Sequence, residues 1–496
     1  MNEAAGAAVT AQALGKTVFG QPPGLATLFL TEMWERFTYY GMRAVLILFM
    51  VTAVSQGGLG LDDKTSSSIY GLYLGSTYFF GLLGGWVADR LLGPQRAVIG
   101  GGLLIVAGNV LLALGNAAIF FTGLIVVAMG VGLLKPNVSS LVASLYPEGG
   151  ARRDAGFSIF YIGINTGSLL GSIFVPLLAA AFGWRFGFAV PALGMTIGLT
   201  QFLWTRRRLG DAGLERAQGR SGSWTPVIVF LTLAALVVIL ALTGIMRLDA
   251  TLLAASASWA YAALGAGFFL YLLFFAGLSS AERKRALVMV TLFAAAVTFW
   301  AGAEQQGASF NLFADRYTDR HIGGWLMPAG VLQGANPFFV ISLAGVFAWL
   351  WIALGKRGIE ISASTKFGFG LILLGLGFLV MYFAAGHVLA GQLVLPTWLI
   401  CTYFLQTCGE LCLSPVGLSY MSKLAPPRFV GQVMGIWFLS NALGGNLAGQ
   451  LTGQYDASHL ASLPALFLRI FWYGVIAGAV MLLLTPFVKR LMAGVR

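Results

Sequence analysis

The stretch EMWERFTYYGMR, residues 32–43, places four charged side chains inside an apolar segment that extends from residue 25 to residue 53. In a helix, Glu32 reaches Arg36 across one turn, and the aromatic residues that follow continue the same face as far as Arg43. A segment of this length can cross a bilayer, where an unpaired charge at the centre costs on the order of 3 kcal/mol. The charged face is therefore predicted to line the interior of a bundle of membrane helices.

The composition of the whole chain indicates the same environment. Of its 496 residues, 58% are hydrophobic and only 10% are charged, which leaves too little polar surface for a water-soluble globule of this size. The apolar runs are continuous and rich in glycine, and they lack the short alternation of a transmembrane β-barrel. Backbone groups in lipid must then be satisfied within helices. We predict an all-α membrane protein.

The hydropathy of the chain predicts fourteen membrane spans. They cover residues 25–53, 65–91, 95–115, 117–145, 155–181, 184–205, 224–246, 253–277, 285–314, 325–354, 364–386, 394–423, 429–453 and 466–490. An even number of spans places both termini on one side of the membrane. About 21 of the 30 Lys and Arg residues fall in the loops of that side, so the positive-inside rule predicts that both termini are cytoplasmic. The net charge of +12 thus belongs to short loops and not to a surface that binds nucleic acid.

The spans divide into two halves. The longest polar connection in the first half of the chain follows the sixth span and resembles a linker between two halves of a transporter. The two spans after it carry no charge in their cores and are interpreted as an insertion, which leaves six spans on each side. The segment GWVADRLLGPQR, residues 85–96, resembles a loop motif of the major facilitator superfamily. We therefore predict a major-facilitator-like fold of two six-helix bundles plus two inserted transmembrane helices. The predicted parts are a cytoplasmic tail 1–24, an N-terminal bundle 25–205, a linker 206–223, the inserted helices 224–277 and a C-terminal bundle 278–496.

Seven charged residues fall inside predicted spans: Glu32, Glu35, Arg36, Arg43, Lys135, Glu304 and Glu410. Snorkelling at helix ends is the alternative explanation for such residues, but Lys135, Glu304 and Glu410 lie well inside their apolar runs. The three positive and four negative charges nearly balance, so we expect them to face one another or a polar cavity. A functional site between the helices is the prediction.

Proline stands beside a polar residue in three spans, at Pro136, Pro337 and Pro415. Each proline removes a backbone hydrogen bond and frees a carbonyl group. Interrupted helices at membrane depth are tolerated where they line a cavity, and they often hold the ligand site of transporters. The prolines therefore predict helix breaks close to the polar site.

The stretch from residue 32 matches the pattern ExxERFxYYG, and at this point the chain resembles the proton-dependent oligopeptide transporter family. Further segments are similar to signatures of the same family: KPN at 135–137, FYIGINTGS at 160–168, WAGAEQ at 300–305 and GELCLSP at 409–415. The resemblance covers both halves, and the two inserted helices fit prokaryotic members. It implies a proton-coupled symporter that imports di- and tripeptides by alternating access across a bacterial plasma (inner) membrane.

The resemblance also implies roles for individual residues. Proton coupling falls to Glu32, Glu35, Arg36 and Glu304, and no histidine lies inside a predicted span to replace the carboxylates. Peptide binding falls to Glu410, Asn165 and Asn336 for the amino group, to Arg43 and Lys135 for the carboxylate, and to Tyr40, Tyr78, Trp300, Trp437 and Phe438 for the side chains. The electrostatics of the buried charges adds two gating pairs, Lys135 with Glu410 and Arg43 with Glu304, which close one side of the molecule in one conformation.

The sequence leaves the cargo open, because the same fold suits an amino acid, nitrate or a peptide-like drug. The combination of Arg43 and Glu410 favours a zwitterion but does not separate one amino acid from two. An enzyme is not expected, since the sequence contains no HExxH, GxxxxGK[ST] or GxSxG motif. A channel is disfavoured because charge pairs between two halves suit alternating access better than a pore. We expect no metal and no cofactor, and a monomer whose partners are a peptide, protons and the bilayer.

Overall fold

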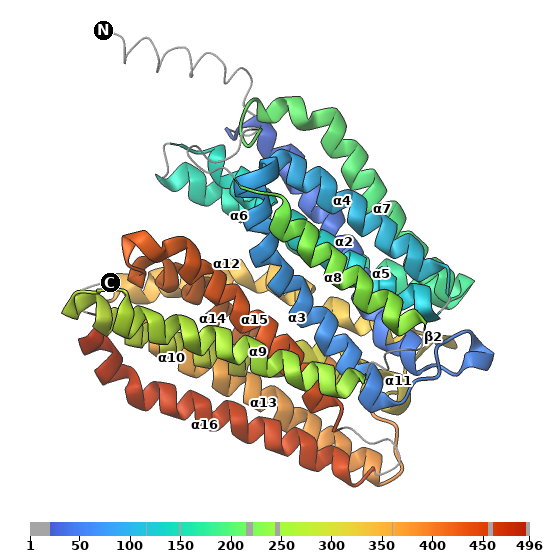
Figure 1. The fold of residues 1–496 in the computed structure, drawn as a ribbon. Helices are drawn as coiled ribbons and strands as arrows, with labels where there is room; N and C mark the ends of the chain where they lie inside the picture. Colours follow the sequence, from blue (N-terminus) through green and yellow to red (C-terminus); the bar gives the residue numbers. More distant parts are fainter. Residues whose placement is uncertain are drawn as a thin grey trace.

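The computed structural model describes residues 20–115, 117–147, 150–214, 222–243, 249–359, 361–454 and 460–492. The described chain is almost entirely helical, and its long helices form two groups that lie side by side (Figure 1). All five predicted parts include residues outside the described ranges. These are residues 1–19 of the tail, 116 and 148–149 of the N-terminal bundle, 215–221 of the linker, 244–248 of the insertion, and 360, 455–459 and 493–496 of the C-terminal bundle.

The N-terminal bundle packs around its first helix, α2, which contacts α6 and α7, while α5 contacts α3 and α4. Prolines at positions 22 and 23 start α2 where the missing N–H costs no helical bond. The helices of this bundle are α2 (Pro23–Val51), α3 (Asp63–Val87), α4 (Pro94–Ala113), α5 (Ala117–Ser144), α6 (Gly150–Phe182) and α7 (Trp184–Thr205). Short turns of other helix types follow, at η1 (Val54–Gln56), at the π-helical η2 (Ala88–Leu92) and at η3 (Arg206–Leu209).

In the C-terminal bundle, α13 packs against α14 and α16, and α10 packs against α15. Ser279 and Glu282 form a capping box at the start of α10. The helices are α10 (Ser280–Ala303), α11 (Ser309–Tyr317), α12 (Ala335–Lys356), α13 (Ala363–Leu389), α14 (Thr397–Leu424), α15 (Val430–Thr452) and α16 (Ser462–Leu491). Shorter turns are η5 (Glu304–Gly307), η6 (Ala329–Gly334) and η7 (Pro427–Phe429).

The two inserted helices are α8 (Thr225–Leu242) and α9 (Ala250–Leu270), and α9 ends in the π-helical turn η4 (Tyr271–Phe275). The side chains of Asn446 and Gln450 on α15 both donate hydrogen bonds to Ser258 of α9, at 2.9 and 2.7 Å. On its other side α9 contacts α3, where Tyr261 packs on Phe79 with ring centroids 5.6 Å apart. The insertion thus touches both bundles along the α3–α15 contact (Figure 1).

The helix breaks predicted at Pro136, Pro337 and Pro415 were wrong. Helices α5 and α14 continue through Pro136 and Pro415, and the amide of Asn137 donates to the carbonyl of Leu133 at 2.7 Å beside the first proline. Pro337 lies in the first turn of α12, where a proline breaks no helical hydrogen bond. The break at membrane depth occurs instead without proline, at η5 between α10 and α11.

The predicted span 325–354 also begins too early. Residues 321–326 form a short antiparallel hairpin of β1 (His321–Ile322) and β2 (Trp325–Leu326), the only strands in the described residues. Gly323 and Gly324 have positive φ values of 57° and 85°, which the tight turn requires. The helix starts only at Ala335, after η6.

By length and composition, ten helical stretches of the described chain can cross a membrane. Four predicted spans are not among them, namely those that became α2, α3, α8 and α15. Charged residues lower the hydropathy of α2, and α8 is a shorter apolar helix. With α10, η5 and α11 counted as one pass, the described elements give fourteen passes in the predicted order. The predicted major-facilitator-like fold of two six-helix bundles with two inserted helices is confirmed.

Candidate functional site

The charged stretch of α2 forms a closed cluster inside the N-terminal bundle. Nε of Arg36 lies 3.0 Å from Oε1 of Glu32 and 2.5 Å from Oε2 of Glu35, and all three side chains are at most 4% exposed. The guanidinium of Arg36 also lies over the ring of Tyr39, 5.3 Å from its centroid. Two carboxylates therefore share one arginine in a space that excludes water.

Lys135 of α5 joins this cluster. It interacts electrostatically with Arg36, Glu35 and Glu32, and most weakly with Glu304 of the opposite bundle, and its Nζ lies 4.4 Å from the ring centroid of Tyr78. Two positive and two negative charges thus balance within the N-terminal bundle. The structure contains no ion pair between Lys135 and Glu410, both of which belong to the described residues.

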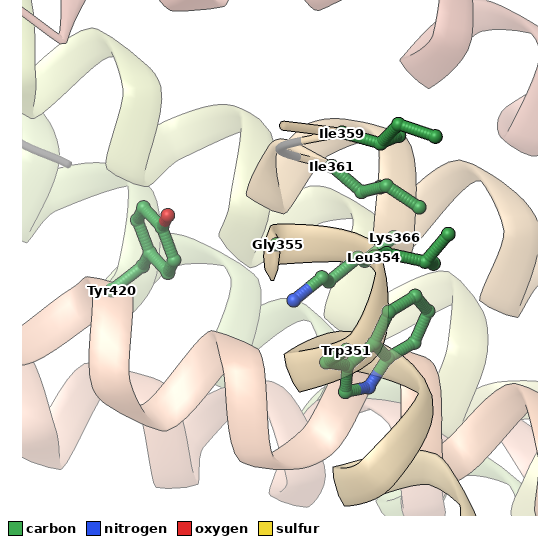
Figure 2. A pocket seen from close by; sticks show the side chains of 7 residues that line it. All are labelled: Trp351, Leu354, Gly355, Ile359, Ile361, Lys366 and Tyr420. Atoms are coloured by element: carbon green, nitrogen blue, oxygen red, sulfur yellow. The ribbon is translucent and has the colours of Figure 1, made fainter. Parts of the chain in front are cut away.

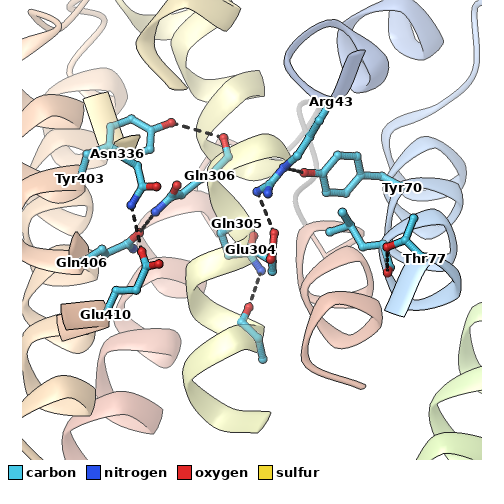
Figure 3. A network of polar contacts seen from close by, with 12 residues as sticks. Arg43, Tyr70, Thr77, Glu304, Gln305, Gln306, Asn336, Tyr403, Gln406 and Glu410 are labelled. Atoms are coloured by element: carbon cyan, nitrogen blue, oxygen red, sulfur yellow. Dashed lines mark hydrogen bonds and ion pairs between the residues drawn. The ribbon is translucent and has the colours of Figure 1, made fainter. Parts of the chain in front are cut away.

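Arg43 links the two bundles. Its Nη2 lies 2.7 Å from Oε2 of Glu304 at the start of η5, and its Nε donates a hydrogen bond of 2.6 Å to the hydroxyl of Tyr70 (Figure 3). The ring centroid of Tyr40 lies 5.6 Å from Cζ of the Arg43 guanidinium. The ion pair is 6–7% exposed, so each charge is stabilised mainly by the other. Breaking this pair leaves a buried charge without its partner.

Glu410 belongs to a separate polar group in the C-terminal bundle. The amide of Asn336 on α12 donates to Oε2 of Glu410 at 3.1 Å and to the hydroxyl of Thr407 at 3.0 Å. Nearby, Gln306 of η5 donates to Gln406 at 3.2 Å, and the hydroxyl of Tyr403 donates to the backbone carbonyl of Gln306 at 3.3 Å (Figure 3). Helices α12 and α14 and the break at η5 are thereby tied into one network.

The remaining predicted residues are placed around these groups with less direct contact. The amide of Asn165 donates to the carbonyl of Tyr161 in its own helix at 2.9 Å, and Tyr161 interacts electrostatically with Glu410 across the bundles. Trp300 packs edge to face against Phe299, and Trp437 packs against Phe367. Trp437 is 3% exposed, whereas Phe438 is 36% exposed.

Two residues whose side chains are hydrogen-bonded to predicted site residues were missed from the sequence. Tyr70 precedes Tyr78 by two helical turns on the same face of α3, and Thr407 precedes Glu410 by one turn on α14. Both residues could have been found in the sequence by looking one or two helical turns away from a predicted site residue. Neither residue carries a charge, which is why a search for charges inside spans passed over them.

The arrangement offers a fixed cation, Arg43, and a fixed anion, Glu410, in opposite bundles. Because Glu304 neutralises Arg43 in this conformation, a proton on Glu304 weakens the link between the bundles and frees the guanidinium for another anion. The cluster around Arg36 provides two further carboxylates, Glu35 and Glu32, about two and three helical turns from Arg43 on α2. Such a site can bind a zwitterion and couple its binding to a proton.

Comparison with known proteins gives a consistent result. Residues 95–467 match the model of the POT family. A peptide transporter from Yersinia enterocolitica is 42% identical, with 96% of each chain covered, and a di-/tripeptide transporter from Lactococcus lactis is 33% identical, covering 97% of this chain and 98% of the relative. The crystal structure of a peptide transporter POT in complex with alafosfalin superposes with a TM-score of 0.89 at 39% identity, covering 97% of this chain and 98% of that chain. The chain belongs to the POT family of transporters.

Proposed function

We propose that this protein is a proton-coupled symporter that imports di- and tripeptides by alternating access. The observation that carries the proposal is the buried ion pair between Arg43 and Glu304, which joins the two bundles at 2.7 Å. The relatives named as peptide and di-/tripeptide transporters support the cargo. A chain with many membrane helices that is related to bacterial transporters is expected in the bacterial plasma membrane. The basic residues in its loops support cytoplasmic termini.

The proposed roles follow the charges. Arg43 and Lys135 bind the peptide carboxylate, Glu410 with Asn336 and Asn165 binds the amino group, and aromatic residues contact the side chains. Proton coupling is assigned to Glu304 and to the cluster around Arg36. The aromatic residues proposed to contact the peptide side chains are Tyr40, Tyr78, Trp300, Trp437 and Phe438. The residues proposed to couple the proton are Glu32, Glu35, Arg36 and Glu304.

The gating pairs need not form together. In this conformation Arg43 pairs with Glu304, whereas Lys135 stays with the carboxylates of its own bundle. We assign the pair of Lys135 and Glu410 to the opposite conformation, in which the other ends of the bundles approach. We propose that the chain divides into an N-terminal bundle 25–205, a linker 206–223, an insertion 224–277 and a C-terminal bundle 278–496. We also propose that the protein is a monomer.

Uptake of a labelled dipeptide into proteoliposomes under an inward proton gradient tests the proposal. We expect the unmodified protein to accumulate the peptide, Glu35→Gln to retain exchange without accumulation, and Arg43→Ala to lose both. Asp154→Asn and Arg207→Ala remove exposed charges and serve as matched controls that transport normally. Absence of accumulation by well-reconstituted protein, with a gradient-driven flux of an amino acid or nitrate instead, would replace the peptide by that cargo.

A further inference from the structure

A cavity of about 250 Å³ lies at the end of α12, away from the charged site. Its lining includes Trp351 and Leu354 from α12, Ile359 and Ile361 from the following loop, Lys366 from α13 and Tyr420 from α14 (Figure 2). Helix α12 begins after the hairpin and ends at Lys356, so the cavity lies at the opposite end of the molecule from the hairpin. In the orientation proposed above, this is the cytoplasmic boundary of the membrane.

Lys366 is the polar centre of the cavity. Its Nζ lies 4.4 Å from the ring centroid of Trp351, and the side chain is half-buried. Among the described residues no carboxylate forms an ion pair with it, and its titratable neighbour is the uncharged thiol of Cys412. A partly desolvated ammonium held only by an aromatic face is stabilised further by any anion that reaches it.

The surroundings of the cavity are basic and apolar at once. Lys356 and Arg357 are exposed in the last turn of α12, and Nζ of Lys423 lies 5.6 Å from the ring centroid of Tyr420. Glu360, which lies outside the described residues, is the only acidic residue between positions 351 and 366. Ile359 is 52% exposed, and with Leu354 and Ile361 it gives the cavity an apolar wall.

This combination selects one kind of ligand. A free inorganic anion gains nothing from the apolar wall, whereas a phospholipid places its phosphate on a lysine and its glycerol and first acyl carbons against isoleucine and leucine. Tryptophan and tyrosine are the side chains that favour the membrane interface, and basic pockets between helices on the cytoplasmic side suit anionic headgroups.

We propose that the cavity between α12, α13 and α14 binds the headgroup phosphate of an anionic phospholipid of the cytoplasmic leaflet, with Lys366 as the phosphate ligand. The assignment to that leaflet rests on the orientation given under the proposed function. The binding itself does not depend on the cargo.

Native mass spectrometry of the full-length protein in detergent tests the site. Phosphatidylglycerol is titrated against the unmodified protein, Lys366→Gln, Lys366→Arg and the matched control Lys489→Gln, which removes an exposed lysine of the same side. We expect Lys366→Gln to weaken the tightest bound phosphatidylglycerol at least about fivefold, and Lys366→Arg and Lys489→Gln to leave it within about twofold. Retained binding by Lys366→Arg shows that the charge, and not the fold, is lost in Lys366→Gln.

Two further arms separate the sources of the phosphate. Phosphatidylcholine with the same acyl chains is expected to bind at least about fivefold more weakly, because its headgroup has no net negative charge. Inorganic phosphate at millimolar concentration is expected not to displace the lipid. Equal binding of the two lipids, displacement by inorganic phosphate, or equal effects of Lys366→Gln and Lys489→Gln would each overturn the proposal. Since the readout is lipid binding, failure of peptide uptake leaves this result intact.

Discussion

At the scale of single residues, the charges inside predicted spans were the informative signal. Arg43 and Glu304 were assigned to one gating pair from the electrostatics of the buried charges, and Nη2 of Arg43 lies 2.7 Å from Oε2 of Glu304 in the structure. The sequence could not show that Lys135 lies with Glu35 and Arg36, because that depends on how α5 is turned against α2. Uncharged partners such as Tyr70 have no signature of their own, since a tyrosine inside a span is more often a packing residue.

Gly307 tests how closely the charged site is packed. A Cβ atom at this position would overlap the hydroxyl of Tyr70 and lie 2.7 Å from Nε of Arg43. We expect Gly307→Ala to separate Arg43 from Tyr70, which leaves a buried charged donor unpaired and lowers dipeptide uptake at least about tenfold. Gly345→Ala is the matched control, because a Cβ atom there meets nothing within 4 Å. Normal uptake by Gly307→Ala at normal expression would contradict the role of this contact.

At the scale of elements, hydropathy located the helices well and their interruptions badly. Thirteen of the fourteen predicted spans overlap one long helix each, while the span 285–314 is divided by η5. Proline was a poor guide, because Pro136 and Pro415 are accommodated inside helices and Pro337 lies in a first turn. The real break at Glu304–Gly307 depends on tertiary hydrogen bonds from Tyr403 and Gln305, which no local pattern encodes.

The contact between α2 and α6 provides a prediction at this scale. A Cβ atom at Gly167 of α6 would overlap the carbonyl oxygen of Met33 on α2, so the two backbones approach as closely as glycine permits. We expect Gly167→Ala to push the helices apart and to lower the free energy of unfolding by about 1–3 kcal/mol. Thermal unfolding of the detergent-purified protein measures the change. Gly386→Ala on α13, where a Cβ atom has open space, is expected to unfold at the unmodified temperature.

At the scale of the whole molecule, polar contacts between the bundles gather toward the hairpin end. Besides Arg43 and Glu304, the amide of Asn311 donates to the carbonyl of Ala44 at 2.9 Å, and Arg316 makes two hydrogen bonds of 2.7 Å to Asp63. In the proposed orientation these contacts close the outer side. The sequence predicted two bundles, but the choice between conformations depends on small differences in contact free energy that no pattern of residues reveals.

The pair of Arg316 and Asp63 tests that closure. Its side chains are 25% and 14% exposed, so the pair contributes about 1 kcal/mol, and its loss is expected to raise the population of the outward-open state about fivefold. With Cys401 replaced by serine, Ser67→Cys on the buried part of α3 reports opening by its rate of labelling with an impermeant maleimide. We expect Asp63→Asn to accelerate labelling about fivefold.

The matched control for this experiment is Asp315→Asn. That substitution removes the ion pair in which Nη2 of Arg320 lies 3.1 Å from Oδ1 of Asp315. Both residues belong to the C-terminal bundle, so this pair does not bear on closure between the bundles. Equal labelling rates in Asp63→Asn and Asp315→Asn would show that the Arg316 pair has no part in closing the outer side.

The charged face of α2 has a consequence for biosynthesis. Among the described helices, α2 is the first along the chain, yet it is absent from those apolar enough to cross a membrane unaided. Its charges are neutralised by Lys135, about 100 residues after Glu35, and by Glu304, about 260 residues after Arg43. We therefore expect this helix to be held in the insertion machinery or at the membrane surface until α5 and η5, which carry these two partners, have been made. Its final place in the bilayer is a product of assembly and not of its own hydrophobicity.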